Sequence, residues 1–270
     1  MLDPLPEPLS VNLGLPPDPR LETAAPVAPA EHVSRKTLPI ERLGALLEVV
    51  LCSGLPTQLL VVAALTGLGL TPRLEGGGWS PLFVALMSLI DMVLVIGLVC
   101  MFLRAHGESL REFVLGRRRP LREAAIGLLL IPAALMLVVL VLVVILSIRP
   151  ELHNVPVNPF VSLLQTPRDA VVFAFVVMFA GGVREEIQRG FIIRRFDHYL
   201  GGGLLGIVIY SGLFGLGHID QGYAAALATG VLGAAWGLLY WSRGSIIAPM
   251  VSHAGFNLAQ LLKYLAVAWR

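Results

Sequence analysis

A long apolar run in the middle of the chain sets the strongest limit on its fold. Residues 135–146 read Leu-Met-Leu-Val-Val-Leu-Val-Leu-Val-Val-Ile-Leu, within an apolar stretch over about 123–148. About 20 apolar residues, each rising roughly 1.5 Å, cross the hydrocarbon core of a bilayer as one helix. The run therefore predicts a lipid-facing transmembrane helix.

The composition extends this interpretation to the whole chain. Of its 270 residues, 56% are hydrophobic and 14% are charged, whereas soluble proteins carry about 25% charged residues. The net charge of +2 is too small to indicate a nucleic-acid partner, so we expect the lipid bilayer as the surroundings and no nucleic acid. Cys52 and Cys100 both lie in apolar stretches, where cysteine is usually a small buried side chain.

Further apolar stretches predict an all-α membrane helix bundle of about seven transmembrane helices. The expected ranges are 43–70 with a kink at Pro56, 81–103, 123–148, 169–199, 203–218, 223–241 and 246–269. We expect a disordered proline-rich tail over residues 1–40, N-terminal transmembrane helices over 41–150 and a core with the catalytic motifs over 167–268. The tail has no basic segment followed by an apolar one, so it does not resemble a cleavable signal peptide.

The arginines predict the orientation. The loop between the second and third expected helices holds the densest group: Arg104, Arg111, Arg117, Arg118, Arg119 and Arg122. Loops rich in Lys and Arg stay on the cytoplasmic side. We therefore expect a cytoplasmic N-terminus in the cell inner or plasma membrane.

Four charged residues interrupt the fourth expected helix. Arg184, Glu185, Glu186 and Arg189 follow the apolar run 173–180 without a turn signal. One charge at the centre of a membrane helix costs about 2.5–3.5 kcal/mol on insertion scales, and such charges normally face a bundle interior. Glu185 and Arg189 are four residues apart, so we expect an ion pair between them.

Two histidines in later apolar stretches complete the candidate site. Glu185 and His218 both lie about 23 Å, as helix, from the turn at residues 201–203, so they can meet at one depth. His253 is expected closer to the cytoplasmic side, and Asn257 shares its helical face. Carboxylate and imidazole groups can hold Zn²⁺, with His218 and His253 as the expected ligands, or can activate a water without metal.

Three segments in order resemble the intramembrane protease family of CAAX prenyl endopeptidases and bacteriocin-processing and immunity proteins (CPBP, ABI-type). That family carries Glu-Glu-x-x-x-Arg, then Phe-x-x-x-His, then His-x-x-x-Asn or Asp. The matching segments here are 185–191, 214–218 and 253–257, and the resemblance covers about residues 167–262.

The resemblance implies an intramembrane (metallo)endopeptidase that cleaves a membrane-associated protein or peptide. It implies catalytic roles for these residues: Glu185, Glu186, His218, His253 and Asn257. Arg189 would make a structural ion pair, and zinc is a possible cofactor. A glutamate would take a proton from water, and Asn257 or an imidazole would stabilise the oxyanion.

The first motif is one residue shorter than in the family. Aligned on Arg189, Glu185 matches the second glutamate, and Arg184 stands where the family has its presumed base. A π-bulge or kink could absorb the slip. Otherwise Glu185 must itself be the base, or the activity is altered or lost.

Two other functions stay open. The position of Arg184 favours a catalytically inactive membrane scaffold or immunity protein of the same fold. Intramembrane Glu and His also occur in proton relays, but a proton-coupled transporter is less favoured because the sequence shows no inverted repeat.

Overall fold

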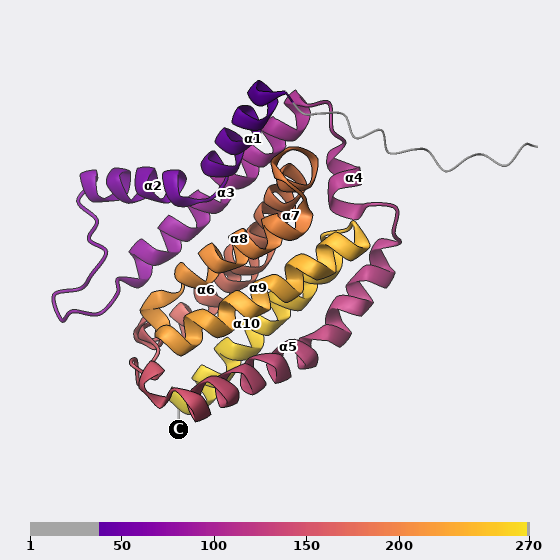
Figure 1. Cartoon of the computed structure of the whole chain (residues 1–270). Coiled ribbons are helices and arrows are strands. Elements are labelled where there is room, and N and C mark those ends of the chain that lie inside the picture. Colours follow the sequence, from indigo (N-terminus) through magenta and orange to yellow (C-terminus); the bar gives the residue numbers. More distant parts are fainter. Residues whose placement is uncertain (1–37, 269–270) are drawn as a thin grey trace, which may run out of the picture. The chain divides into compact units, whose positions relative to one another are not determined.

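The computed structural model describes residues 38–268, and helices dominate this part of the chain (Figure 1). Within these residues no β-strand forms; one isolated bridge joins Arg73 and Trp79. The prediction of an all-α membrane bundle is confirmed. The predicted disordered tail over residues 1–40 lies almost entirely outside the described residues.

The N-terminal helices differ from the prediction of one kinked helix over 43–70. The structure has two helices, α1 (Pro39–Leu51) and α2 (Leu55–Gly67). Gly54 lies between them in a left-handed conformation (φ 86°), which glycine adopts without steric cost. Pro56, in the first turn of α2, lacks the N–H that a continuous helix would need. In Figure 1, α2 accordingly runs in a different direction from α1.

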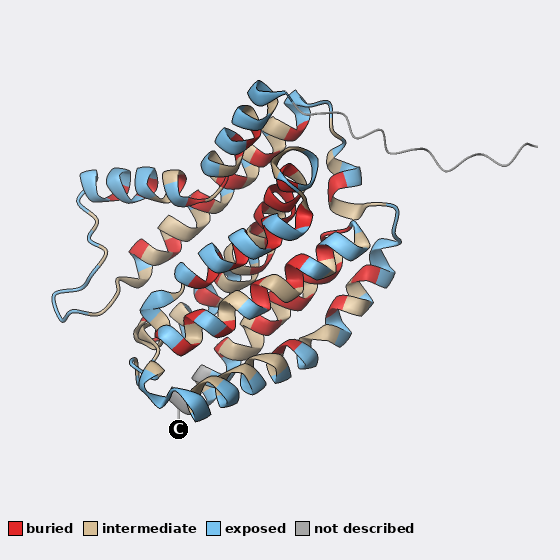
Figure 2. Ribbon diagram, viewed as in Figure 1, coloured by how far each residue is buried: buried red, intermediate tan, exposed pale blue. Residues whose placement is uncertain are grey.

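The next helices are the most lipid-like part of the chain. They are α3 (Pro81–Ala105), the short α4 (Leu110–Leu115) and α5 (Pro120–Ile148). Much of the outer face of α5 is exposed (Figure 2), although its side chains there are apolar, such as Leu129 and Met136. Exposed apolar side chains on a long helix fit a lipid environment.

A continuous helical stretch from residue 167 to residue 200 carries the first motif. It comprises α6 (Pro167–Val176), the π-helix η4 (Val177–Arg184), α7 (Glu185–Arg195) and the π-helix η5 (Phe196–Leu200). It starts with a capping box in which Thr166 and Asp169 satisfy each other's backbone N–H groups.

Three further helices surround this stretch. They are α8 (Gly203–Leu216), α9 (Tyr223–Arg243) and α10 (Ile247–Ala268). Short 3₁₀ turns complete the described part: η2 (Pro150–Leu152), η3 (Pro159–Leu163) and η6 (Ile219–Gln221). The central α7 packs against α1, α3, α8, α9 and α10, and Phe191 on it is fully buried. Charged residues on α7 are thereby kept away from lipid.

Four helical segments of the described residues are long and apolar enough to cross a membrane: Pro39–Gly67, Pro81–Ala105, Leu110–Ile148 and Tyr223–Arg243. Together with the helical fold, they identify an integral membrane protein. The other expected spans are helical as well, and α8 is a shorter apolar helix. The number of about seven crossings stays a prediction.

Candidate active site

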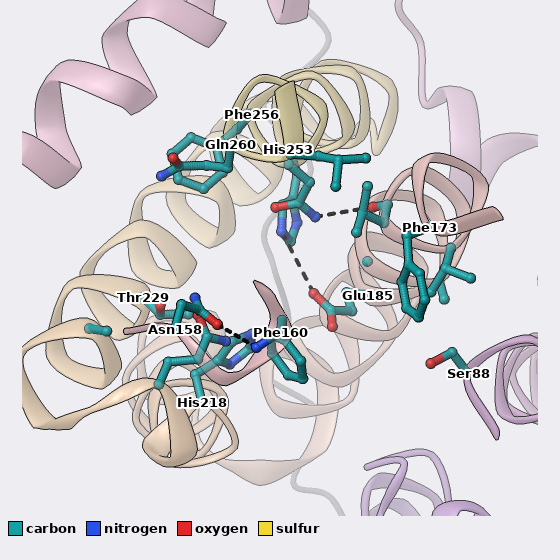
Figure 3. A pocket seen from close by; sticks show the side chains of 18 of the residues that line it. Ser88, Asn158, Phe160, Phe173, Glu185, His218, Thr229, His253, Phe256 and Gln260 are labelled. Carbon is teal, nitrogen blue, oxygen red and sulfur yellow. Dashed lines mark hydrogen bonds and ion pairs between the residues drawn. The ribbon is translucent and has the colours of Figure 1, made fainter. Parts of the chain in front are cut away.

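A pocket of about 460 Å³ lies inside the bundle, between α3, η4 and the helices α8 to α10. Four of the predicted site residues line it: Glu185, His218, His253 and Asn257. Figure 3 shows that Glu185 and His253 point toward one another, while His218 comes from the turn that follows α8. Glu186 does not line the pocket. The structure thus brings together motifs that lie far apart in the sequence.

The π-helix η4 positions the first motif against α10. A Cβ atom on Gly182 would lie only 2.5 Å from the Cβ of Ala254, and one on Gly181 would lie 2.7 Å from Nδ2 of Asn257. The close approach of η4 and α10 therefore depends on these two glycines. A π-helix adds a residue to a turn, and η4 ends at Arg184, directly before the two glutamates.

The two glutamates have different partners. Glu186 is 1% exposed, and one of its oxygens, Oε1, accepts hydrogen bonds from Arg189 and from Nδ1 of His253, the latter at 2.7 Å. Oε2 of Glu185 instead lies 3.7 Å from Nε2 of His253. The predicted ion pair between Glu185 and Arg189 is therefore wrong. Arg189 pairs with Glu186, because Glu185 faces the pocket.

His253 is held on three sides. Its ring stacks on Trp236 with the ring centres 3.8 Å apart, and Phe214 meets it edge-on at 6.0 Å. Because the carboxylate of Glu186 only accepts, Nδ1 of His253 carries the proton in this contact. The lone pair on Nε2 then faces Glu185. His253 was expected closer to the cytoplasmic side than Glu185, but this difference in depth does not keep the two residues apart.

His218 and Asn257 complete the wall of the pocket. Nδ1 of His218 lies 2.8 Å from the carbonyl oxygen of Phe214, so it donates there and Nε2 is left with a lone pair. Nδ2 of Asn257 donates one hydrogen bond to the carbonyl oxygen of Val177 at 3.2 Å. An amide NH₂ carries two donors, so one N–H of Asn257 remains for a ligand.

A metal does not fit the donor set as it is placed. Zinc needs three or four ligands at about 2.0–2.2 Å. Among residues 38–268, no three His, Cys, Asp or Glu side chains lie close enough together to hold an ion. Zinc ligation by His218 and His253 stays a prediction.

A charge pair that the sequence did not connect lies beside the pocket. Arg184 pairs with Asp91 of α3, and Thr57 of α2 donates to the same carboxylate at 2.5 Å. All three side chains are buried. Opposite charges inside a membrane bundle usually pair, and this was the available signal. The separation of 93 positions in the sequence hid the partner. This pair links the N-terminal helices to η4.

The comparisons with known proteins agree with the motifs. Residues 167–259 match the family model described as type II CAAX prenyl endopeptidase Rce1-like. No curated protein and no solved structure matches the chain. The match includes every predicted site residue and excludes Asp91. The expected family resemblance is confirmed over residues 167–259, which are similar to the type II CAAX prenyl endopeptidase Rce1-like family model.

Proposed function

We propose that this protein is an intramembrane endopeptidase that hydrolyses a peptide bond in a membrane-associated protein or peptide. The Rce1-like match supports this class of reaction. One structural observation carries the proposal: Glu185 faces Nε2 of His253 at 3.7 Å, inside a pocket of about 460 Å³. At this distance the two groups do not bond directly, but both can accept a proton from one water.

In the proposed first step, Glu185 is the general base. A water that donates one hydrogen bond to Glu185 and the other to Nε2 of one imidazole, His253 or His218, gives a proton to the carboxylate, and its oxygen forms a bond to the carbonyl carbon of the substrate. The electron pair of the C=O bond moves onto the carbonyl oxygen. The remaining N–H of Asn257 can donate to that oxyanion.

In the second step, the proton returns to the leaving group. Protonated Glu185 gives its proton to the amide nitrogen, and the C–N bond breaks. The products are a new carboxyl terminus and a new amino terminus. A general base of this kind typically contributes about 10²–10⁴-fold to the rate.

Glu186 and Arg189 position the base and the imidazole. Arg189 is 1% exposed and lies 4.6 Å over the ring of Phe214. Its charge compensates that of Glu186, which in turn orients His253. We therefore propose that Glu186 acts through His253 and does not touch the substrate.

The same arrangement supports an enzyme over an inactive scaffold. The scaffold interpretation relied on Arg184 standing where the family has its base. In the structure Arg184 pairs with Asp91, Glu185 faces the pocket and Glu186 pairs with Arg189. Glu185 can therefore take the role of the base and Glu186 that of the partner of the arginine, although the motif is one residue shorter than in the family.

The experiment compares peptide termini in membranes from cells that produce either the wild-type protein or Glu185→Gln. We expect new termini with the wild type only. Glu151→Gln is the control, because Glu151 is an exposed acid in the α5–α6 connection. Equal sets of termini in wild type and Glu185→Gln would refute the proposal, and would favour the scaffold if His218→Ala with His253→Ala also kept the cellular phenotype.

A further inference from the structure

A second pocket, of about 400 Å³, lies at one end of the bundle, apart from the candidate active site. It forms where the α4–α5 turn, the end of α7 and the α9–α10 turn meet. Its walls carry four arginines and a single acid: Arg117, Arg118, Arg194, Arg243 and Glu112. No step of the proposed hydrolysis uses any of these side chains.

Backbone contacts join the two turns that form the pocket. The N–H of Ile246 and the hydroxyl of Ser245 both donate to the carbonyl oxygen of Val114, at 3.0 and 3.2 Å. Gly116 lies against the carbonyl group of Gly244, where any Cβ atom would overlap it. In Figure 1 the start of α10 accordingly lies close to the start of α5. The pocket is thus part of the packed structure.

Fixed contacts already orient three of the arginines. Arg243 donates from Nε and an NH₂ group to buried Glu123, at 2.5 and 2.6 Å. Nε of Arg118 donates to the carbonyl oxygen of Arg243 at 3.3 Å, and Arg194 pairs with Glu108. A guanidinium has five N–H donors, so each of these contacts leaves further donors for a ligand.

The charges in the pocket do not balance. Glu123 and Glu108 compensate Arg243 and Arg194. Within residues 38–268, no ion pair engages Arg117 or Arg118, both of which are exposed. Glu112 is the one acid among the residues that line the pocket, and the buried Glu123 is already hydrogen-bonded to Arg243. Converging guanidinium groups match the geometry of a phosphate, which can accept two parallel hydrogen bonds from each.

We infer that this pocket binds a phosphate group, carried by an anionic phospholipid headgroup or by a soluble phosphate. Its arginines lie at the end of the bundle that the charge distribution assigns to the cytoplasm. Basic pockets between transmembrane helices on that side are suited to anionic headgroups. The inference does not depend on the proposed peptidase activity.

The test uses the purified full-length protein in detergent micelles. The thermal unfolding midpoint is measured while phosphatidylglycerol, phosphatidylcholine or inorganic phosphate is added. The test variant is Arg117→Gln with Arg118→Gln. The matched control is Arg111→Gln with Arg119→Gln, which removes the same charge from the same region without lining the pocket.

We expect a saturable rise of the midpoint for wild type and control, and a loss of more than about tenfold in apparent affinity for the test variant. Protection by phosphatidylglycerol alone identifies a lipid headgroup, and equal protection by inorganic phosphate identifies a soluble ligand. Glu112→Gln should tighten binding in either case. The inference would be overturned if neither phosphatidylglycerol nor inorganic phosphate protected the wild type, or if the two double variants had equal affinities.

Discussion

The close contact between η4 and α10 leads to a quantitative prediction for Gly182→Ala. The new Cβ would lie 2.5 Å from Cβ and 2.7 Å from Cα of Ala254. Carbon atoms pack at about 3.5–4.0 Å, so the two helices must separate by roughly 1 Å. Neither atom of Ala254 can rotate away, because one is backbone and the other is attached directly to it.

This separation should lower both stability and activity. Overpacking costs about 1–3 kcal/mol, and the better helix propensity of alanine offsets up to about 1 kcal/mol. We expect a net loss of about 1–2 kcal/mol in the free energy of unfolding. Ala254 adjoins His253, and a shift of about 1 Å in an active site can cost about 10²-fold in rate.

The assay is unfolding of the purified protein in detergent, with Gly97→Ala as the control. Gly97 lies in α3 with open space where its Cβ would be, so this change should be neutral or stabilising. Adding Ala254→Gly to Gly182→Ala should restore part of the loss, since it removes only the 2.5 Å contact. If Gly182→Ala is as stable as Gly97→Ala, the proposed packing of η4 on α10 is wrong.

Four further predictions follow from other parts of the molecule. Asp91→Ala leaves buried Arg184 without its counter-charge and should lower the free energy of unfolding in detergent by about 3–5 kcal/mol. The double variant Asp91→Ala with Arg184→Ala should be more stable than Asp91→Ala alone, and equal stability of the two would refute the role of this pair. Burial would raise the pKa of Glu108, but hydrogen bonds and charges from Arg195 and Arg194 hold it below the ordinary 4.5. The stabilisation from ionised Glu108 is therefore full above about pH 4.5 and is lost as the pH falls through the lower folded-state pKa. Between pH 7 and pH 3 the unfolding midpoint of Glu108→Gln should fall less than that of the wild type. An equal fall in both proteins would contradict this prediction. Elemental analysis of protein purified without chelators tests the zinc prediction: bound zinc that His218→Ala loses would support it, and full activity after exhaustive chelation would contradict it. Protease protection of a tag at the N-terminus of chains in right-side-out vesicles should show it inside, and cleavage of that tag by added protease would refute the orientation.

The sequence was sufficient to predict the fold class and most of the helices. Long apolar stretches separated by glycine and proline signals placed α3, α5, α8, α9 and α10 within a few residues. The exception was the first expected helix. A single hydropathy window treats Pro56 as a kink, but the left-handed Gly54 two residues before it ends the helix.

Four of the residues that the sequence predicted for the site line one pocket, but the sequence did not predict how they pair. Helical spacing of four residues suggested Glu185 for Arg189, and this holds only on a regular α-helix. The π-helix η4 and the contact of Glu186 with His253 change which glutamate faces the pocket. Both depend on packing between segments 67 residues apart, which a local pattern cannot contain. The buried pair of Asp91 with Arg184 was missed for the same reason.

The most direct test of the central claim is the single-turnover rate of peptide-bond cleavage by purified Glu185→Gln in proteoliposomes, on the bond identified from the membrane termini. This change keeps the shape of the side chain and removes its capacity to take a proton. The account predicts a fall of about 10²–10⁴-fold in the rate, with little change in substrate binding and none in Glu151→Gln. A rate for Glu185→Gln equal to that of the wild type would contradict the assignment of Glu185 as the base.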